Sequence, residues 1–326
     1  MTVLYLVGLI GLLCAVLVGR LALLEFRRDR IPVLNYHRVV SDRDISRCAR
    51  GAYVISETEF EKQMCHLKGK GFTAIDLDDY LYYRDHRSEL PAKPIIITFD
   101  DGYENNYLYA YPALKKCGFK AVIYSISDPD ASFFKNFEFP EQLLSPAQMK
   151  ELSDNGISIQ GHTHSHVALK DQTDETIEYE LATCKKNLEA ITGRPVRHMA
   201  IPWGLFDNRL FEIARHTGYR TMEVPGRGTI NLDTDLFHLR RLSVHNLTTL
   251  PQLDKMVSSR LNTLIHRLYV FVQLAIRNTV GHGVELKIRR LLLKLGLDNP
   301  ESILKFAVGL GAAAAALYLL IRFAGC

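Results

Sequence analysis

Paired cysteines and a strong excess of one charge are both missing from this sequence. The 326 residues include six cysteines, none of which forms a C-x-x-C pair or belongs to a dense framework. This scatter excludes a disulfide scaffold and a cysteine zinc ribbon, and it favours a reducing compartment. Forty Lys and Arg residues against 36 Asp and Glu residues give a net charge of +4, which is too small to indicate nucleic acid as a main partner.

Long apolar runs are present, and they lie at both ends of the chain. Residues 3–19 carry no charge and, with the apolar residues up to Leu24, would span roughly 33 Å as a helix, enough to cross a bilayer. No basic residue precedes this run and no small-x-small cleavage site follows it, so we predict an uncleaved N-terminal anchor over residues 1–26 instead of a signal peptide. Residues 303–323 predict a second membrane helix, with a helix buried in protein as the alternative.

The segment before the second apolar run, residues 258–298, combines apolar side chains at helical spacing with lysine and arginine. Such basic amphipathic helices often lie on a membrane surface, where lipids are the partner, and packing against the globular part is the alternative. Three arginines, Arg27, Arg28 and Arg30, directly follow the first apolar run. By the positive-inside rule they predict an integral protein of a bacterial inner membrane with its middle part in the cytoplasm, and a reversed orientation would place that part in the periplasm.

The middle part, residues 31–248, alternates short apolar strands with helices. Predicted strands cover 32–36, 94–99, 120–126, 157–160, 198–202 and 219–224. Predicted helices cover 56–70, the residues up to 116, the residues after a capping box at 145–148, 174–192 and 207–217. Strands that alternate with helices pair in parallel, which predicts an α/β fold, either a barrel or a doubly wound sheet.

Polar clusters follow four of these strands, where α/β folds carry their functional groups. The clusters are His37, Asp100-Asp101, His162-Thr163-His164-Ser165-His166 and Pro202-Trp203-Gly204. Because the strands are predicted to be parallel, these four strand ends can converge on one rim.

The clusters contain the donor types of a metal site. Successive side chains alternate in direction, so Asp101 can bind a metal while Asp100 stays free to take a proton. His162 and His166, at positions i and i+4, reach one ion if their loop coils helically. Three such ligands with an open position for water predict metal-assisted hydrolysis of an amide, with Asp100 as the base and a histidine across the site as the acid.

Three motifs extend this interpretation: Thr98-Phe99-Asp100-Asp101-Gly102, the His162–His166 pentapeptide, and Pro202-Trp203-Gly204. In order and in placement they resemble the motifs of the polysaccharide deacetylase family (carbohydrate esterase family 4). The resemblance covers residues 32–245. It implies a deformed (β/α) barrel of seven or eight strands and one divalent metal ion, zinc first, with cobalt, nickel or iron as alternatives.

The resemblance also implies roles for single residues. Asp100 matches the family's catalytic base, and the metal ligands correspond to Asp101, His162 and His166. Thr163 occupies the Ser/Thr place between the two histidines and is expected to support them. In the motif that starts at Pro202, the backbone N–H of Trp203 would donate to the oxyanion of the tetrahedral intermediate.

The general acid and the partner of the base depart from the commonest family pattern. The opening residues 32–39 resemble the branch that acts on poly-N-acetylglucosamine, in which an early Tyr-His pair supplies the acid, and this implies His37. His245 is the alternative, because it is nearest to the family's late Leu-x-His motif. Ala200 stands where the family often has an arginine that steadies the base, and Arg241 could substitute for it. Tyr103, next to the first motif, is a candidate substrate contact.

Taken together, the sequence predicts a membrane-anchored, metal-dependent N-deacetylase that acts on an N-acetylated amino sugar. A cytoplasmic domain would act on a sugar linked to a polyprenyl phosphate, and a periplasmic one on an exopolysaccharide or peptidoglycan. A non-haem iron oxygenase also uses two histidines and one carboxylate, but on antiparallel β folds. A third hypothesis is a catalytically degenerate protein that binds glycan or scaffolds a membrane polysaccharide synthase.

Overall fold

The computed structural model describes residues 30–48, 53–131, 142–224, 226 and 228–258, and all of these except Ser258 belong to one compact unit, Asp29–Val257. The predicted anchor at 1–26, the predicted helix at 303–323 and all but the first residue of the segment 258–298 lie outside the described residues. Within the described ranges, no helix combines the length and the apolar character that crossing a membrane requires.

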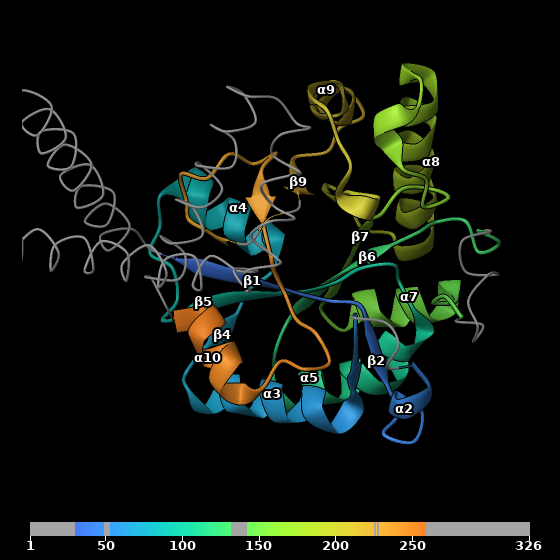
Figure 1. The fold of residues 1–326 in the computed structure, drawn as a ribbon. Coiled ribbons are helices and arrows are strands. Elements are labelled where there is room, and N and C mark those ends of the chain that lie inside the picture. The colour runs from blue at the N-terminus through green and yellow to red at the C-terminus, as the bar shows by residue number, and fades with distance from the viewer. Residues whose placement is uncertain (1–29, 49–52, 132–141, 225, 227, 259–326) are drawn as a thin grey trace, which may run out of the picture. The chain divides into compact units, whose positions relative to one another are not determined.

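A single sheet forms the centre of this unit (Figure 1). Its strands are β1 (Ile31–Tyr36), β4 (Thr73–Ala74), β5 (Pro94–Phe99), β6 (Ala121–Ser125), β7 (Ile157–Gly161), β8 (His198–Ala200), β9 (Thr221–Val224), β10 (Thr229–Ile230), β11 (Leu239–Arg240) and β12 (Leu242–Ser243). They follow the order β10-β1-β5-β6-β7-β8-β9-β11, and every pairing from β1 to β11 is parallel. All residues of β1 and β6 are buried, as expected for parallel strands that are covered on both faces.

The segment 239–243 brings the two ends of this sheet together. Its first half, β11, pairs with β9, and its second half, β12, pairs in parallel with β1. Arg241 lies between the two halves. The sheet is therefore a nearly closed barrel, which agrees with the predicted α/β class and with a deformed (β/α) barrel. Its parallel strands are unlike the antiparallel folds of the oxygenase alternative.

Helices surround the sheet (Figure 1). They are α2 (Ile45–Cys48), α3 (Glu57–Gly69), α4 (Leu77–His86), the π-helix η1 (Asn106–Ala110), α5 (Tyr111–Cys117), α7 (Pro146–Asp154), α8 (Asp174–Thr192), α9 (Asn208–His216) and α10 (Leu250–Ser258), with short 3₁₀ turns η2 (Leu169–Asp171) and η3 (Pro202–Gly204). Helix α3 packs beside α5, and α8 packs between α7 and α9. The predicted capping box at Ser145 is present in both directions, and at Ser56 the side chain accepts from the backbone of Glu59.

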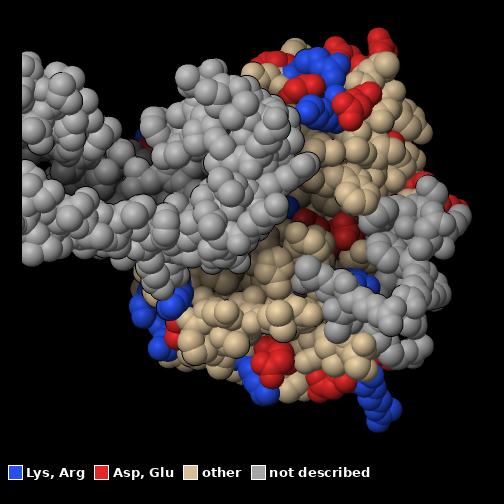
Figure 2. Space-filling model, viewed as in Figure 1, with Lys and Arg blue, Asp and Glu red and all other residues tan. Residues whose placement is uncertain are grey.

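The predicted strands and helices of the middle part agree with the structure within a few residues. The sequence interpretation did not include α4, α10, or the two-stranded sheet of β2 (Arg38–Val40) and β3 (Val54–Ser56). On the face drawn in Figure 2, basic and acidic side chains are interspersed among the coloured residues, and neither sign dominates.

Candidate active site

The predicted site residues lie at the carboxyl ends of the parallel strands. His37 follows β1, the two aspartates follow β5, the histidine loop follows β7, and Trp203 lies in η3 after β8. The backbone N–H of Asp100 donates to the carbonyl oxygen of Tyr36 over 3.0 Å, which ties the end of β5 to the residue before His37. The strand ends therefore converge on one rim, as parallel pairing requires.

Left-handed backbone separates the two neighbouring carboxylates. Asp101 has φ of 76° and Gly102 has the same value, whereas side chains other than glycine rarely adopt this region. A Cβ at Gly102 would overlap the side chain of Ser125 on β6, so the turn needs glycine at this position. The turn directs Asp101 toward the histidine loop while Asp100 pairs with Arg241 on the other side.

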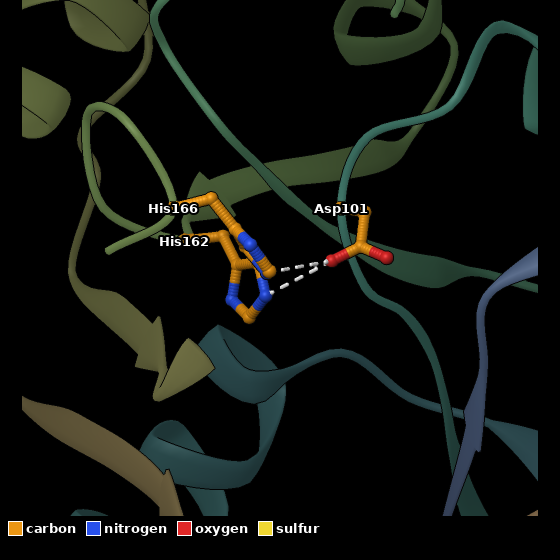
Figure 3. Close-up of side chains that lie close together, drawn as sticks. All are labelled: Asp101, His162 and His166. Carbon is orange, nitrogen blue, oxygen red and sulfur yellow. Dashed lines mark ion pairs between the residues drawn. The ribbon is translucent and has the colours of Figure 1, made fainter. Parts of the chain in front are cut away.

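Asp101, His162 and His166 form a compact group of metal-type donors. Their ligand atoms all lie within 4.8 Å of one another, and all three residues are buried. Nε2 of His162 and Nε2 of His166 each lie 3.2 Å from Oδ1 of Asp101. Figure 3 shows the two rings extending from one loop toward the same carboxylate oxygen.

The histidines meet without the helical coil that we expected for their loop. Residues 162–166 are not helical, and Thr163 and His166 have φ of 65° and 63°. The side chain of Thr163 accepts the backbone N–H of His166 over 3.0 Å, which closes the turn. Glu180 on α8 accepts the backbone N–H and the hydroxyl of Ser165 over 2.8 and 2.5 Å. Side-chain hydrogen bonds therefore hold the loop where a helix was expected to do so.

The hydrogen bonding of His162 fits a metal ligand. Its Nδ1 lies 2.9 Å from the carbonyl oxygen of Ala200, which only accepts, so Nδ1 carries a proton. In the neutral ring, Nε2 then presents a lone pair to the negatively charged Asp101 carboxylate, and the two repel each other. A cation bound between them would attract both. A ligating histidine that donates its other N–H to a carbonyl is the usual support of such sites. Two imidazoles and one carboxylate suit zinc or a similar divalent transition metal.

Arg241 holds Asp100. Its Nη1 and Nη2 donate to the two oxygens of Asp100 over 2.6 and 2.8 Å, a bidentate pair in which the arginine side chain is 10% exposed. Asn35 also donates to Asp100, over 3.3 Å. Ala200, at the place where the resembling family often has arginine, is fully buried on β8. The guanidinium in contact with Asp100 thus comes from the segment that closes the barrel.

Burial and charge act against each other at both aspartates. Burial raises the pKa of Asp100, but Arg241, His162 and His37 together outweigh it and lower that pKa below its usual value. Burial likewise raises the pKa of Asp101, and the two histidines that face the carboxylate hold that pKa well below the usual value. Both carboxylates are therefore ionised at neutral pH.

His37 lies beside Asp100, and His245 lies near the tyrosine that stacks on His37. Nε2 of His37 is 3.8 Å from Oδ2 of Asp100. Tyr53 stacks on His37 with ring centroids 4.5 Å apart, and His245 lies 5.3 Å from Tyr53. Burial lowers the pKa of His37 more than the nearby aspartates raise it. The neutral ring is therefore its main form at neutral pH.

The remaining predicted residues occupy different positions. Trp203 is 59% exposed, its ring lies 5.3 Å from that of His166, and its Nε1 donates to the His166 carbonyl over 3.2 Å. Its φ of 61° lies in η3, which Pro202 begins. Tyr103 is 3% exposed and packs with Ile126 and Ala131. The substrate contact expected at Tyr103 stays a prediction.

Sequence reasoning missed four residues that contact the site: Asn35, Tyr53, Glu180 and Glu223. Glu223 lies within β9, where a carboxylate among apolar neighbours is an available signal. Glu180 lies in α8 and is buried, but nothing in the helix pattern distinguishes it from its exposed acidic neighbours. Tyr53 and Asn35 gave no signal before their neighbours were known.

This nearly closed α/β barrel brings two histidines and an aspartate together at the carboxyl ends of its strands, where they could hold a metal ion. The polysaccharide deacetylase family profile matches residues 87–222. Relatives and solved structures agree with this match, so the described unit contains a polysaccharide deacetylase domain.

Similar proteins extend over most of the described unit. YxkH of Bacillus subtilis (strain 168) is 28% identical over 215 residues, which cover 66% of this chain and 71% of that protein. A poly-beta-1,6-N-acetyl-D-glucosamine N-deacetylase of Staphylococcus epidermidis is 24% identical over 68% of this chain and 82% of its own length. The crystal structure of a polysaccharide deacetylase from Bacillus cereus matches with a TM-score of 0.58 and 28% identity, covering 71% of this chain and 70% of that one.

Proposed function

We propose that this protein removes the acetyl group from an N-acetylhexosamine of a glycan, with a divalent metal held by Asp101, His162 and His166. The observation that carries the proposal is the convergence of these donors within 4.8 Å, next to an aspartate that a buried arginine holds. Zn²⁺, Co²⁺, Ni²⁺ or Fe²⁺ bound there would polarise the amide carbonyl and make its bound water more acidic. The names of the B. cereus and S. epidermidis relatives support the substrate class.

Asp100 would act as the base. Its carboxylate is ionised and fixed by Arg241, and its Oδ2 faces His37. It would take a proton from the attacking water while the new C–O bond to the acetyl carbon forms. A bidentate guanidinium keeps the carboxylate in one orientation, so little reorganisation is needed at the moment of reaction.

His37 would act as the acid. Because burial lowers its pKa, the ring is mainly neutral before the reaction, and it would receive the proton of Asp100 at Nε2 across the 3.8 Å that separates the two groups. It would then give this proton to the departing amine as the C–N bond breaks, which yields acetate and an amino sugar. The backbone N–H of Trp203 would donate to the oxyanion, a role that comes from the family resemblance.

We also propose that the chain is anchored in a bacterial inner membrane with this domain on the cytoplasmic side. Support comes from the apolar run at 3–19, the arginines after it and the basic segment 258–298. On that side the substrate would be a sugar linked to a polyprenyl phosphate and not a finished extracellular polymer. A periplasmic domain would act on exopolysaccharide or peptidoglycan.

The test combines metal analysis with acetate release by the full-length protein in detergent. N-acetylglucosamine linked to a polyprenyl phosphate and polymeric N-acetylglucosamine are compared as substrates, with zinc or cobalt added. We expect Asp100→Asn to retain the metal and to lose at least a hundredfold in kcat, since it removes the base and keeps the shape. A wild-type protein that binds metal and releases no acetate from either substrate would instead support the glycan-binding or scaffold hypothesis.

A further inference from the structure

A second buried carboxylate, Glu223, contacts Arg241 from the side opposite Asp100. Glu223 lies on β9 and is 1% exposed. Its Oε2 is 2.9 Å from Nε of Arg241. The other edge of the same guanidinium donates to both oxygens of Asp100. One arginine is therefore held between two carboxylates, and the mechanism above uses only one of them.

The strand register explains why the Arg241 guanidinium has room beside Glu223. Glu223 on β9 is paired with Ala200 on β8, and paired residues of parallel strands project to the same face of a sheet. Ala200 has the smallest chiral side chain, which leaves room beside Glu223. Arg241 reaches this room from the neighbouring segment, since β11 pairs with β9 and ends just before it. The Arg241 guanidinium also lies 5.6 Å from the ring centre of Tyr124 on β6.

We infer that Glu223 is a positioning residue that fixes the direction of the Arg241 guanidinium and, through it, the orientation of Asp100. The inference rests on the proposed function, because it takes Asp100 as the base. An arginine side chain has many rotamers, and two hydrogen bonds to Asp100 alone leave its approach to that carboxylate adjustable. An ion pair at Nε, with a carboxylate on a rigid strand, selects the rotamer in which both Nη atoms meet Asp100.

The charges around Glu223 agree with this role. Burial raises the pKa of Glu223 to about 7, and Arg241 is the strongest influence that acts in the opposite direction. The other groups that act on it are Asp100, Tyr124 and His162. Its ionised form therefore depends on the arginine it holds. Glu223, Arg241 and His37 all lie outside residues 87–222, so the family match does not include them.

The test uses two substitutions that differ in one hydrogen-bond acceptor. Glu223→Gln keeps an oxygen that can accept from Nε, whereas Glu223→Met has a similar length and no such oxygen. Steady-state kinetics are measured on the full-length metal-loaded protein with a β-1,6-linked N-acetylglucosamine oligomer. We expect Glu223→Met to lower kcat by about 10- to 100-fold with KM changed less than twofold, and Glu223→Gln to retain kcat within about fivefold. The metal content should stay the same in both.

A double-mutant cycle asks whether Glu223 acts through Arg241. In an Arg241→Ala background we expect Glu223→Met to lower kcat less than twofold further, because the group it positions is gone. The matched control is Thr221→Val, which removes another buried hydrogen-bonding side chain from the same face of β9, one that contacts His198. Its kcat should stay within twofold of the wild type.

Three results would overturn the inference. They are a wild-type kcat in Glu223→Met, an undiminished loss in the Arg241→Ala background, and an equal loss in Thr221→Val. A metal-loaded wild type without activity would instead contradict the proposed function and remove the premise on which the role of Glu223 rests.

Discussion

At the scale of single residues, the site depends on neighbours that point in opposite directions. Asp100 and Asp101 are adjacent, yet one pairs with Arg241 and the other with two histidines. In an extended strand, successive side chains already point to opposite faces. The left-handed φ of Asp101 and Gly102 turns the chain more sharply and separates the two carboxylates further. The glycine of the motif is therefore required by the turn and not by the chemistry.

We expect Gly102→Ala to destabilise the protein and to weaken metal binding together. The new Cβ would require a left-handed φ of 76° and would meet the backbone and side chain of Ser125, a cost of about 2 kcal/mol or more. Urea unfolding and metal titration measure the two effects. Adding Ser125→Gly should restore only part of the stability, since the Ser125 backbone also lies close. A variant as stable as the wild type would show that the turn tolerates a side chain.

Asp101→Asn tests the carboxylate as a ligand. The amide keeps the shape but removes the negative charge that both histidines face, so we expect the metal affinity to fall by roughly a hundredfold. Competition with a chelator of known affinity measures this change. Asp78→Asn, which alters a carboxylate that pairs with Arg197 and His198 instead, is the control and should leave the affinity unchanged.

At the scale of elements, helix α8 holds the histidine loop from outside. Glu180 accepts two hydrogen bonds from Ser165, which lies next to the proposed ligand His166. We expect Glu180→Gln to lower the metal affinity about tenfold, because an amide can accept only through its single oxygen and the loop loses one of its two bonds. Isothermal titration with zinc measures the loss. Glu178→Gln, on the exposed side of the same helix, is the control, and an equal effect there would contradict the anchoring role.

The contact between α4 and β8 predicts a pH dependence of stability. Hydrogen bonding with His198, followed by Arg197, lowers the pKa of Asp78 from 3.8 to about 2. A depressed pKa stabilises the fold above the unfolded pKa, and the contribution disappears as the pH falls from about 4 through about 2. The side chain is 45% exposed, so solvent screens the pair, and we expect Asp78→Asn to cost about 1 kcal/mol at pH 6. Urea unfolding of both proteins should show this difference shrinking below pH 4.

An element can be predicted from the sequence when its buried side chains form a clear apolar pattern. Strands such as β5 and β6 are covered on both faces and carry continuous apolar runs, so they were predictable. Helix α4 mixes three aspartates and three tyrosines with two leucines, so its buried side is not evident from the sequence. The strands β11 and β12 have two residues each and flank Arg241, which in the sequence resembles an exposed charge. The residues of the histidine loop with left-handed backbone are a threonine and a histidine, and neither residue type predicts a positive φ.

At the scale of the whole molecule, the closure of the barrel and the chemistry depend on the same segment. Residues 239–243 join β9 to β1, and Arg241 in their middle contacts Asp100 from β5 and Glu223 from β9. Asp100, the proposed base, is therefore oriented by Arg241 only when both ends of the sheet have met. This explains how a chain with alanine at position 200 still presents an arginine to Asp100: the guanidinium comes from the segment between β11 and β12, which is distant in sequence and adjacent in space.

In the proposed membrane-anchored protein, the side of the membrane on which this domain lies decides which substrate it can meet, and a native thiol can report that side. Cys65 on α3 is exposed, and its Sγ lies 3.8 Å from that of Cys117. In a variant that keeps only Cys65, with the other five cysteines changed to serine, we expect a membrane-impermeant maleimide to label the protein in lysed cells and not in intact ones. This expectation follows from the arginines after the first apolar run, which favour the cytoplasm. A fully cysteine-free variant gives the background.

Labelling in intact cells would place the domain outside and contradict the lipid-linked substrate at the inner leaflet. The pair of thiols supplies an independent readout, because an oxidising compartment would favour a disulfide between Cys65 and Cys117, whereas the cytoplasm would keep both reduced. Trapping free thiols in the wild type before lysis, followed by mass spectrometry, distinguishes the two states. Reduced thiols together with protection in intact cells would leave only substrates that the cytoplasmic side of the membrane presents.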